Sequence, residues 1–197
     1  MNGIYIRPDG LSRNTFLCGQ GLMPAISAKR MQNRSDAILD AARRVFVARG
    51  FQAASIAEIA RAAKISDGLI YRYFDSKQRL LDAVLGAFFQ RILAVLEPEI
   101  AALEGFPAKL CALIRVHLQV MLDDPGLCHL FIAEVRGAAE SANSEAQKMS
   151  ARYSAVFLSV VRAADAAGEL RAGLDPHLLR DLVFGGVEFF AWRAMSA

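Results

Sequence analysis

The side chains with the clearest binding chemistry lie in the run SIAEIARAAKISDGLIYRYFDSK, residues 55–77. One face of its second half combines hydrogen-bonding and aromatic groups with a glycine that leaves room for close approach: Asp67, Gly68, Tyr71 and Arg72. Lys77 follows at an expected helix start, where a positive charge beside free backbone N–H groups suits a phosphate. This combination favours contact with DNA, and the alternative is an ordinary packing unit that carries surface tyrosines.

Two short helices joined by a tight turn must position this face. Ser55 and Glu58 form a capping box, which marks the start of the first helix. Apolar residues then recur at helical spacing, at Ile56, Ile59, Ala60 and Ala63. Ser66 marks the second start, because its side-chain oxygen can accept from the free N–H groups of a first turn. A short helix that projects from a bracing helix fits the major groove of DNA.

The wider run GFQAASIAEIARAAKISDGLIYRYFDSKQRLLDAVL, residues 50–85, closely resembles the N-terminal signature of TetR-family transcriptional regulators. The positions that match the signature are Gly50, Phe51, Ser55, Ile56, Ile59, Ala60, Ile65, Ser66, Gly68, Tyr71, Tyr73, Phe74, Lys77 and Leu80. The resemblance implies an all-α protein with an N-terminal three-helix, helix-turn-helix DNA-binding domain and a helical ligand-binding and dimerisation domain. It also implies a ligand-responsive repressor that binds double-stranded operator DNA as a homodimer.

The resemblance also implies which residues face DNA. By the matching positions they are Ser55, Asp67, Gly68, Leu69, Tyr71, Arg72, Tyr73 and Lys77. Three of them would hold phosphates: Ser55, Tyr73 and Lys77. Leu69 would touch a thymine methyl group, and Arg72 would reach a guanine or a phosphate. Asp67 departs from the family pattern, because many relatives carry a basic or neutral residue there. Its negative charge weakens DNA binding near phosphates, unless the carboxylate accepts from a cytosine amine or serves only the helix start.

The charge of the chain is unevenly distributed. Residues 1–79 hold 13 Lys and Arg against 6 Asp and Glu, whereas residues 80–197 hold 10 against 14. The net charge of +3 therefore combines a basic front part with an acidic back part. The basic part coincides with the predicted helix-turn-helix, which indicates that nucleic acid is contacted at one end only.

The sequence predicts neither an enzyme nor a metal or cofactor site. The three cysteines have no CxxC spacing, and the three histidines lie far apart: Cys18, Cys111, Cys128, His117, His129 and His177. No nucleophile–base set and no phosphate-cradling glycine loop is present. Leu80–Leu96 is the most apolar run, but Asp82 and Arg91 interrupt it, so no membrane span is expected. We expect a cytoplasmic protein.

Helical periodicity continues along the rest of the chain, and no strand pattern appears. The predicted helices are Ser35–Arg49, Lys77–Leu96 capped by Asp75 and Ser76, Ala108–Leu122, Leu127–Gly137, Ala142–Ala167 and a last one from Pro176 to Trp192. Pro98 is expected to break the pattern after Leu96. Asp123–Gly126 is expected to form a turn.

Three segments divide the chain by function. Residues 1–32 are rich in Gly, Pro, Ser and Asn, and we expect them to be poorly ordered. We expect residues 33–79 to form the DNA-binding domain. We expect residues 80–197 to form the effector and dimerisation domain, apparently without a final helix. The basic residues ahead of the first helix would reach DNA as an arm or remain solvated: Lys29, Arg30 and Arg34.

The apolar surplus of residues 80–197 allows a ligand between helices, and the alternative is a filled core. The pocket candidates are His117, Met121, Phe131 and Glu134. The runs FIAEVR at 131–136, GEL at 168–170 and FG at 184–185 resemble the fatty-acid-responsive FadR-type branch of the family. That resemblance implies an acyl-CoA or another long apolar effector, which would shift the Lys77–Leu96 helix and change the spacing of the two DNA-reading heads.

The last predicted helix is too apolar to face water, which favours a dimer interface. The interface candidates are Leu182, Gly186, Phe189 and Phe190. TetR regulators usually end with two helices in a dimer bundle, whereas this chain stops after the first, so we expect either a truncated chain that lacks the final helix or a reduced interface. A small-molecule binding protein with a vestigial DNA-binding function is the alternative.

Overall fold

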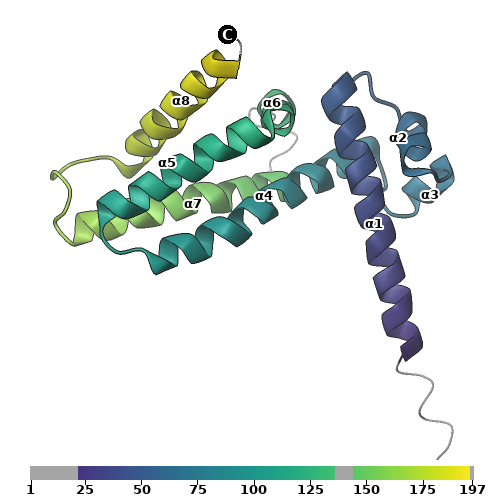
Figure 1. Cartoon of the computed structure of the whole chain (residues 1–197), viewed down its shortest axis with the longest axis horizontal. Helices are drawn as coiled ribbons and strands as arrows, with labels where there is room; N and C mark the ends of the chain where they lie inside the picture. Colours follow the sequence, from purple (N-terminus) through teal and green to yellow (C-terminus); the bar gives the residue numbers. More distant parts are fainter. Residues whose placement is uncertain (1–21, 136–143, 196–197) are drawn as a thin grey trace, which may run out of the picture. The chain divides into compact units, whose positions relative to one another are not determined.

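The computed structural model describes residues 22–135 and 144–195, with side chains from Lys29 onward, and this part of the chain contains eight α-helices and no strand (Figure 1). In chain order they are α1 (Leu22–Arg49), α2 (Ile56–Ala63), α3 (Asp67–Tyr71), α4 (Lys77–Ala102), α5 (Phe106–Asp123), α6 (Pro125–Glu134), α7 (Glu145–Ala166) and α8 (Pro176–Met195). The all-α prediction is therefore confirmed.

The described chain divides after Ala37 into two units. The first contains the N-terminal part of α1, where Gln32 Nε2 donates to Asp36 Oδ1 over 2.9 Å. The second unit contains everything from Ile38 onward.

The helix-turn-helix is assembled on the C-terminal part of α1. Ile38, Ala42 and Phe46 recur at helical spacing and are fully buried. Ile59 of α2 and Ile70 of α3 are also fully buried in the same hydrophobic core. Each of the two short helices is thus held by one completely buried isoleucine, which leaves its opposite face exposed.

The helix starts differ in how they are capped. The Ser55 capping box is present, and Ser76 Oγ accepts from the backbone N–H of Arg79 over 3.1 Å, as predicted. Ser66 is the N-cap of α3, but its side chain makes no capping hydrogen bond, so the predicted side-chain cap is wrong. Its backbone carbonyl instead accepts from the N–H of Leu69 over 3.0 Å, which closes the first turn.

Two helices are longer than the sequence pattern indicates. α1 begins at Leu22 and not at Ser35, so the helix includes residues 22–32 of the predicted extension. Poor order of this segment stays a prediction. Between Pro24 and Gly50 no proline or glycine interrupts the chain, and Pro24 lies in the first turn, where its missing N–H is tolerated. Residues 1–21, the other part of the predicted extension, lie outside the described residues.

α4 continues through Pro98 to Ala102, so the predicted break at this proline is wrong. Leu96 and Ile100 on either side of it are buried. Their packing holds the helix together across the position where a proline interrupts the hydrogen-bond ladder.

The boundaries of α6 and α7 also differ from the prediction. Pro125 and Gly126 open α6 and do not belong to a turn, and α6 ends at Glu134. Proline suits the first position of a helix because its N–H is not needed there. The predicted boundaries at Gly137 and Ala142 lie outside the described residues.

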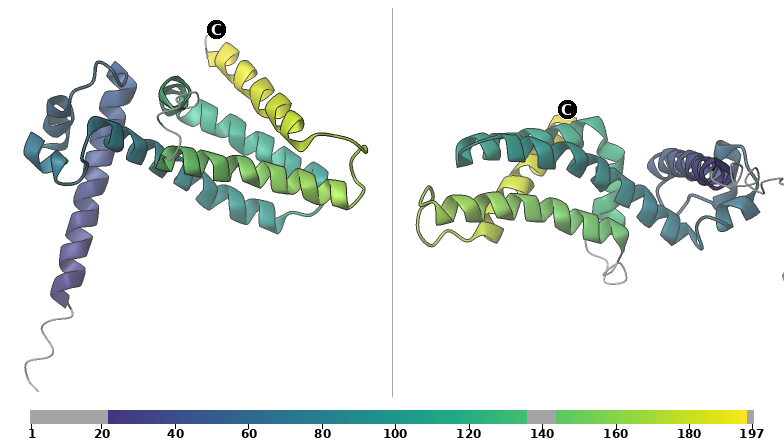
Figure 2. Two further views of the ribbon diagram at one scale, coloured as in Figure 1. Left: turned by 180° about the vertical axis from the view of Figure 1, so that it is seen from behind. Right: turned by 90° about the horizontal axis from the view of Figure 1, so that it is seen from below.

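α4, α5, α7 and α8 pack against one another to form the back part of the molecule (Figure 2). Asp82 of α4 is buried, and its carboxylate accepts from the first N–H groups of α7, at Glu145 over 3.0 Å and Ala146 over 2.8 Å. A carboxylate at a helix N-terminus is stabilised by those N–H groups. The aspartate that interrupts the apolar run of α4 therefore fixes the start of α7.

Candidate nucleic-acid interface and effector cavity

The outer face of α3 is open to solvent. Asp67, Gly68 and Arg72 are exposed, Tyr71 is 53% exposed, and Leu69 is half-buried. A Cβ added to Gly68 would meet no atom within 4 Å, so packing inside the protein does not require a glycine at this position. The structure thus leaves this face accessible, and its contacts with DNA stay a prediction.

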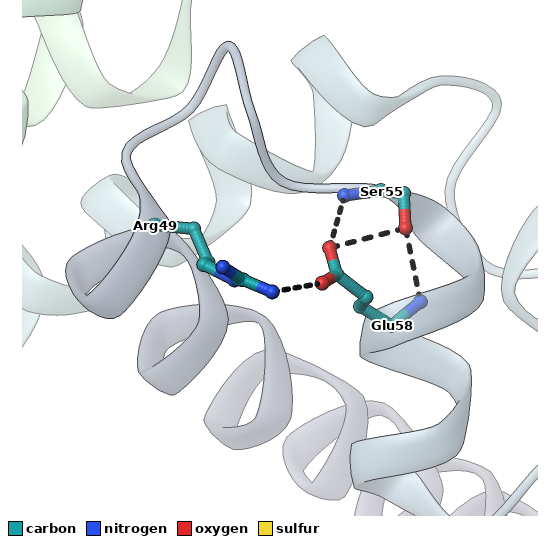
Figure 3. A network of polar contacts seen from close by, with 3 residues as sticks. All are labelled: Arg49, Ser55 and Glu58. Atoms are coloured by element: carbon teal, nitrogen blue, oxygen red, sulfur yellow. Dashed lines mark hydrogen bonds and ion pairs between the residues drawn. The ribbon is translucent and has the colours of Figure 1, made fainter.

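Ser55 is engaged in a local polar network (Figure 3). Glu58 Oε2 accepts from the backbone N–H of Ser55 over 3.1 Å and from its hydroxyl over 3.2 Å, and Ser55 Oγ accepts from the N–H of Glu58. Arg49 Nη2 donates to Glu58 Oε1 over 3.1 Å. These hydrogen bonds, the backbone one first, lower the pKa of Glu58. For the Ser55 hydroxyl to donate to a phosphate, its O–H must turn away from Glu58 Oε2.

Lys77 was predicted to hold a phosphate, but in the structure it binds backbone carbonyls. Its Nζ donates to the carbonyls of Phe51 over 2.9 Å, Gln52 over 3.2 Å and Ala54 over 3.0 Å. The ammonium also lies 4.6 Å from the centre of the Phe51 ring. An ammonium has three N–H donors, and three carbonyls occupy them. In this structure Lys77 therefore holds the connection between α1 and α2.

We expect Lys77→Met to lower the stability of the protein by about 1–3 kcal/mol, because charged hydrogen bonds are lost and carbonyls are left without a donor. The dependence of duplex-DNA affinity on salt should stay unchanged. Thermal unfolding and fluorescence anisotropy across a salt series measure the two effects. A drop of about 0.9 in the slope of log K against log salt, with unchanged stability, would assign Lys77 to a phosphate after all.

The remaining predicted phosphate ligand is Tyr73. It is half-buried and packs against the hydrophobic core, and its backbone N–H donates to the carbonyl of Ile70 over 2.9 Å. This packing fixes the position of the ring. Its contact with DNA stays a prediction.

A cavity of about 510 Å³ lies between α4, α5, α6, α7 and α8. Three of the four predicted pocket residues line it: His117, Met121 and Phe131. Glu134 is not among the residues that line it, and its contact with a ligand stays a prediction. The Glu134 carboxylate accepts from Gln52 Nε2 over 3.4 Å, because the end of α6 points toward the connection between α1 and α2.

Polar side chains that the sequence analysis did not single out line the same cavity. Tyr153 Oη lies 2.8 Å from His117 Nδ1, and Glu188 Oε1 lies 3.8 Å from His117 Nε2. Arg180 donates to Ser154 Oγ over 3.0 Å. The sequence could have indicated Arg180 and Glu188, because positions 180, 184 and 188 lie on one face of α8.

The opposite face of α8 presents a set of exposed apolar side chains. Leu182, Phe189 and Phe190 are each more than 60% exposed, and Gly186 between them is half-buried. Positions 182, 186 and 190 repeat every four residues, so they share a helix face. The predicted interface residues are thus accessible, and their contact with a second chain stays a prediction.

Within residues 22–135 and 144–195, no group of three or more His, Cys, Asp or Glu residues is arranged to hold a metal ion. No helix in the same part is long and apolar enough to cross a bilayer.

Comparison with solved structures and curated proteins identifies relatives over most of the chain. The chain is 26% identical over 155 residues to the fatty acid metabolism regulator protein of Bacillus subtilis (strain 168), covering 77% of this chain and 78% of that protein. It is 24% identical to the HTH-type transcriptional repressor KstR2 of Rhodococcus jostii (strain RHA1), covering 85% and 84%. The crystal structure of the transcriptional regulator FadR from Bacillus subtilis in complex with stearoyl-CoA has the same fold, with a TM-score of 0.71 and 24% identity over 79% of this chain and 83% of that one.

Two family models match the two parts of the chain. Residues 38–84, which contain the helix-turn-helix and its exposed α3 face, match the model of bacterial regulatory proteins of the tetR family. Residues 105–192, which contribute most of the cavity, match the model of the tetracyclin repressor-like C-terminal domain. The chain therefore belongs to the tetR family of bacterial regulatory proteins.

Proposed function

We propose that this protein is a transcriptional repressor that binds operator DNA as a homodimer and is released by a small apolar effector. The observation that carries the proposal is the exposed α3 face inside the matched tetR domain. A cavity between the helices of the matched C-terminal domain supports a ligand-responsive protein. The relative named for fatty acid metabolism and the FadR structure with stearoyl-CoA favour an acyl-CoA-like effector.

Transmission from the cavity to the DNA-binding domain would use α4 and α6. α6 contributes Cys128 and Phe131 to the cavity wall. At its start, the Asp124 carboxylate accepts from Arg43 of α1 over 2.8 Å. A Cβ added to Gly126 would lie 2.4 Å from a methyl group of Val47, so this end of α6 touches α1 closely. An effector that displaces α6 would therefore act on the helix that supports α3, through its different affinity for the two states.

We expect Arg43→Ala to weaken this coupling without removing either binding activity, because the ion pair lies outside both sites. Coupling between sites is typically about 5–150-fold, and the variant should reduce the effect of a ligand on operator affinity several-fold. Fluorescence anisotropy with and without stearoyl-CoA, the ligand of the FadR structure, measures this effect. The exposed neighbour Arg44→Ala is the matched control, and the double exchange Arg43→Asp with Asp124→Arg should restore coupling. Full coupling in Arg43→Ala would exclude this route.

Light scattering tests the proposed function directly. The purified chain should have the mass of a dimer and should form a larger complex with a duplex from the region upstream of its own gene. A monomer that ignores the DNA at low salt would instead favour a small-molecule binding protein with a vestigial DNA-binding domain. That second function is supported by the cavity alone.

A further inference from the structure

The turn between α2 and α3 contains the one residue other than glycine that has a positive φ within residues 22–135 and 144–195. This residue is Lys64, the C-cap of α2, with φ 56° and ψ 47° in the left-handed region. The other positive-φ positions of the described chain are all glycines: Gly50, Gly105, Gly168 and Gly173. The described chain therefore uses glycine wherever the backbone turns in this way, except just before the helix that is predicted to read DNA.

The path of the chain requires the left-handed conformation at position 64. The backbone N–H of Lys64 donates to the carbonyl of Arg61 over 3.2 Å, and the N–H of Ile65 donates to the carbonyl of Ala60 over 3.0 Å. These two bonds close the end of α2 and turn the chain sharply, so that Ile65 packs against the hydrophobic core. Glycine is the usual residue at such a position because it has no Cβ, whereas lysine is disfavoured there.

The side chain of Lys64 has no role inside the described part of the protein that would explain a lysine. It is exposed, and its ammonium makes no hydrogen bond or ion pair with a described residue. Asp67 follows three residues later and is also exposed, but the two side chains do not form an ion pair. An unfavourable backbone conformation at a residue whose charged group binds nothing in the described protein indicates a function in binding.

The other cations of the helix-turn-helix show which of them are available to DNA. Arg43 and Arg49 have carboxylate partners, and Lys77 donates to three backbone carbonyls. Lys64 and Arg72 are exposed, and they bracket α3, since Lys64 lies three residues before its first residue and Arg72 is its C-cap. The phosphate backbones form the two walls of the major groove, and contacts with them fix the register of a reading helix.

We propose that Lys64 binds a DNA phosphate beside the major groove that α3 enters, the role predicted for Lys77. This proposal rests on the proposed function, since it concerns the same DNA-binding face. The lysine side chain is long and flexible and extends from the turn that leads into α3. The contact carries no information about the DNA sequence and holds the reading helix in register.

Lys64→Gly tests the proposal, because it removes the ammonium and supplies the residue that the left-handed conformation favours. Fluorescence anisotropy across a salt series measures its affinity for two duplexes, one from the region upstream of the gene and one of unrelated sequence. One phosphate contact contributes about 0.9 to the slope of log K against log salt, so a dimer should lose about 1.8. Affinity for both duplexes should fall at least about tenfold at about 0.1 M salt, because phosphates are common to all DNA.

Thermal unfolding of the same variant separates a phosphate contact from a structural role. Lys64→Gly should have a Tm higher by about 2–4 °C, because the strain at the left-handed position is relieved. A variant that gains stability does not lose DNA affinity through partial unfolding. An unchanged salt slope in Lys64→Gly would overturn the proposal, whatever the Tm.

Two further substitutions and one control examine the charge itself. Lys64→Arg keeps the positive charge and should keep the wild-type slope, whereas Lys64→Asn suits the left-handed conformation without a charge and should show the same loss as Lys64→Gly. Equal slopes in these two variants would overturn the proposal. Lys148→Gln removes an exposed positive charge on α7, outside the matched tetR domain, and should leave the slope unchanged.

Failure of this proposal and failure of the proposed function are distinguishable. Tight binding of the upstream duplex with a wild-type slope in Lys64→Gly rejects the role of Lys64 alone. Equal affinity of the wild-type chain for both duplexes, with a slope that depends on Lys64, rejects an operator-specific repressor and supports the phosphate contact. A wild-type chain that binds neither duplex at low salt rejects both.

Discussion

Replacement of Tyr71 by alanine should remove operator binding and leave the fold intact. The side chain is 53% exposed on the outer face of α3, whereas its neighbour Ile70 is fully buried and anchors the helix. Truncation at position 71 therefore leaves the core unchanged. A good contact with a base contributes about 1–3 kcal/mol. A dimer loses it twice, so the operator affinity should fall at least about thirtyfold.

Fluorescence anisotropy with a labelled duplex from the region upstream of the gene measures this loss, and circular dichroism verifies the fold. Tyr71→Phe keeps the ring and removes the hydroxyl, so it shows whether stacking or a hydrogen bond carries the contact. Gln90→Ala, an exposed change on α4, is the control outside the predicted interface. Wild-type affinity in Tyr71→Ala would mean that α3 does not read DNA.

Replacement of Phe190 by glutamate should convert the protein from a dimer to a monomer. Phe190 is 65% exposed on the apolar face of α8. Leu182 and Phe189 are also exposed on this helix, so the exposed apolar surface is more than that of a single surface side chain. A two-fold interface would bury this residue from both protomers, so each dimer would contain two unpaired charges. The chains would then separate. Operator affinity should fall with the dimer, because two linked half-sites bind more tightly than one.

Light scattering over a concentration series measures the mass, and anisotropy measures the DNA affinity. Val95→Glu is the matched control, because Val95 is 62% exposed on α4 and the change introduces the same charge. Phe190→Leu keeps an apolar side chain and should remain a dimer. A dimeric Phe190→Glu variant would place the interface on another surface.

The helix-turn-helix could be predicted from the sequence because its signals are local. Ser55 and Glu58 are three residues apart, and their reciprocal hydrogen bonds depend only on the geometry of one helical turn. The outward position of Tyr71 and the buried position of Ile70 also follow from helical periodicity alone. Capping and periodicity depend only on residues a few positions apart, so they can be recognised without knowledge of the rest of the fold.

The polar contacts of the cavity and of Lys77 were decided by tertiary structure. Lys77 bonds carbonyls 23–26 residues earlier in the chain, and His117 meets Tyr153 from a helix 36 residues later. An ammonium can donate to a phosphate or to a carbonyl, and a buried tyrosine has the same sequence pattern as an apolar residue. The packing of the helices determines the partners of both Lys77 and Tyr153. The sequence by itself therefore determined where the helix-turn-helix forms and which face of α3 is exposed, whereas packing decided what holds the turn before α2 and which polar groups line the cavity.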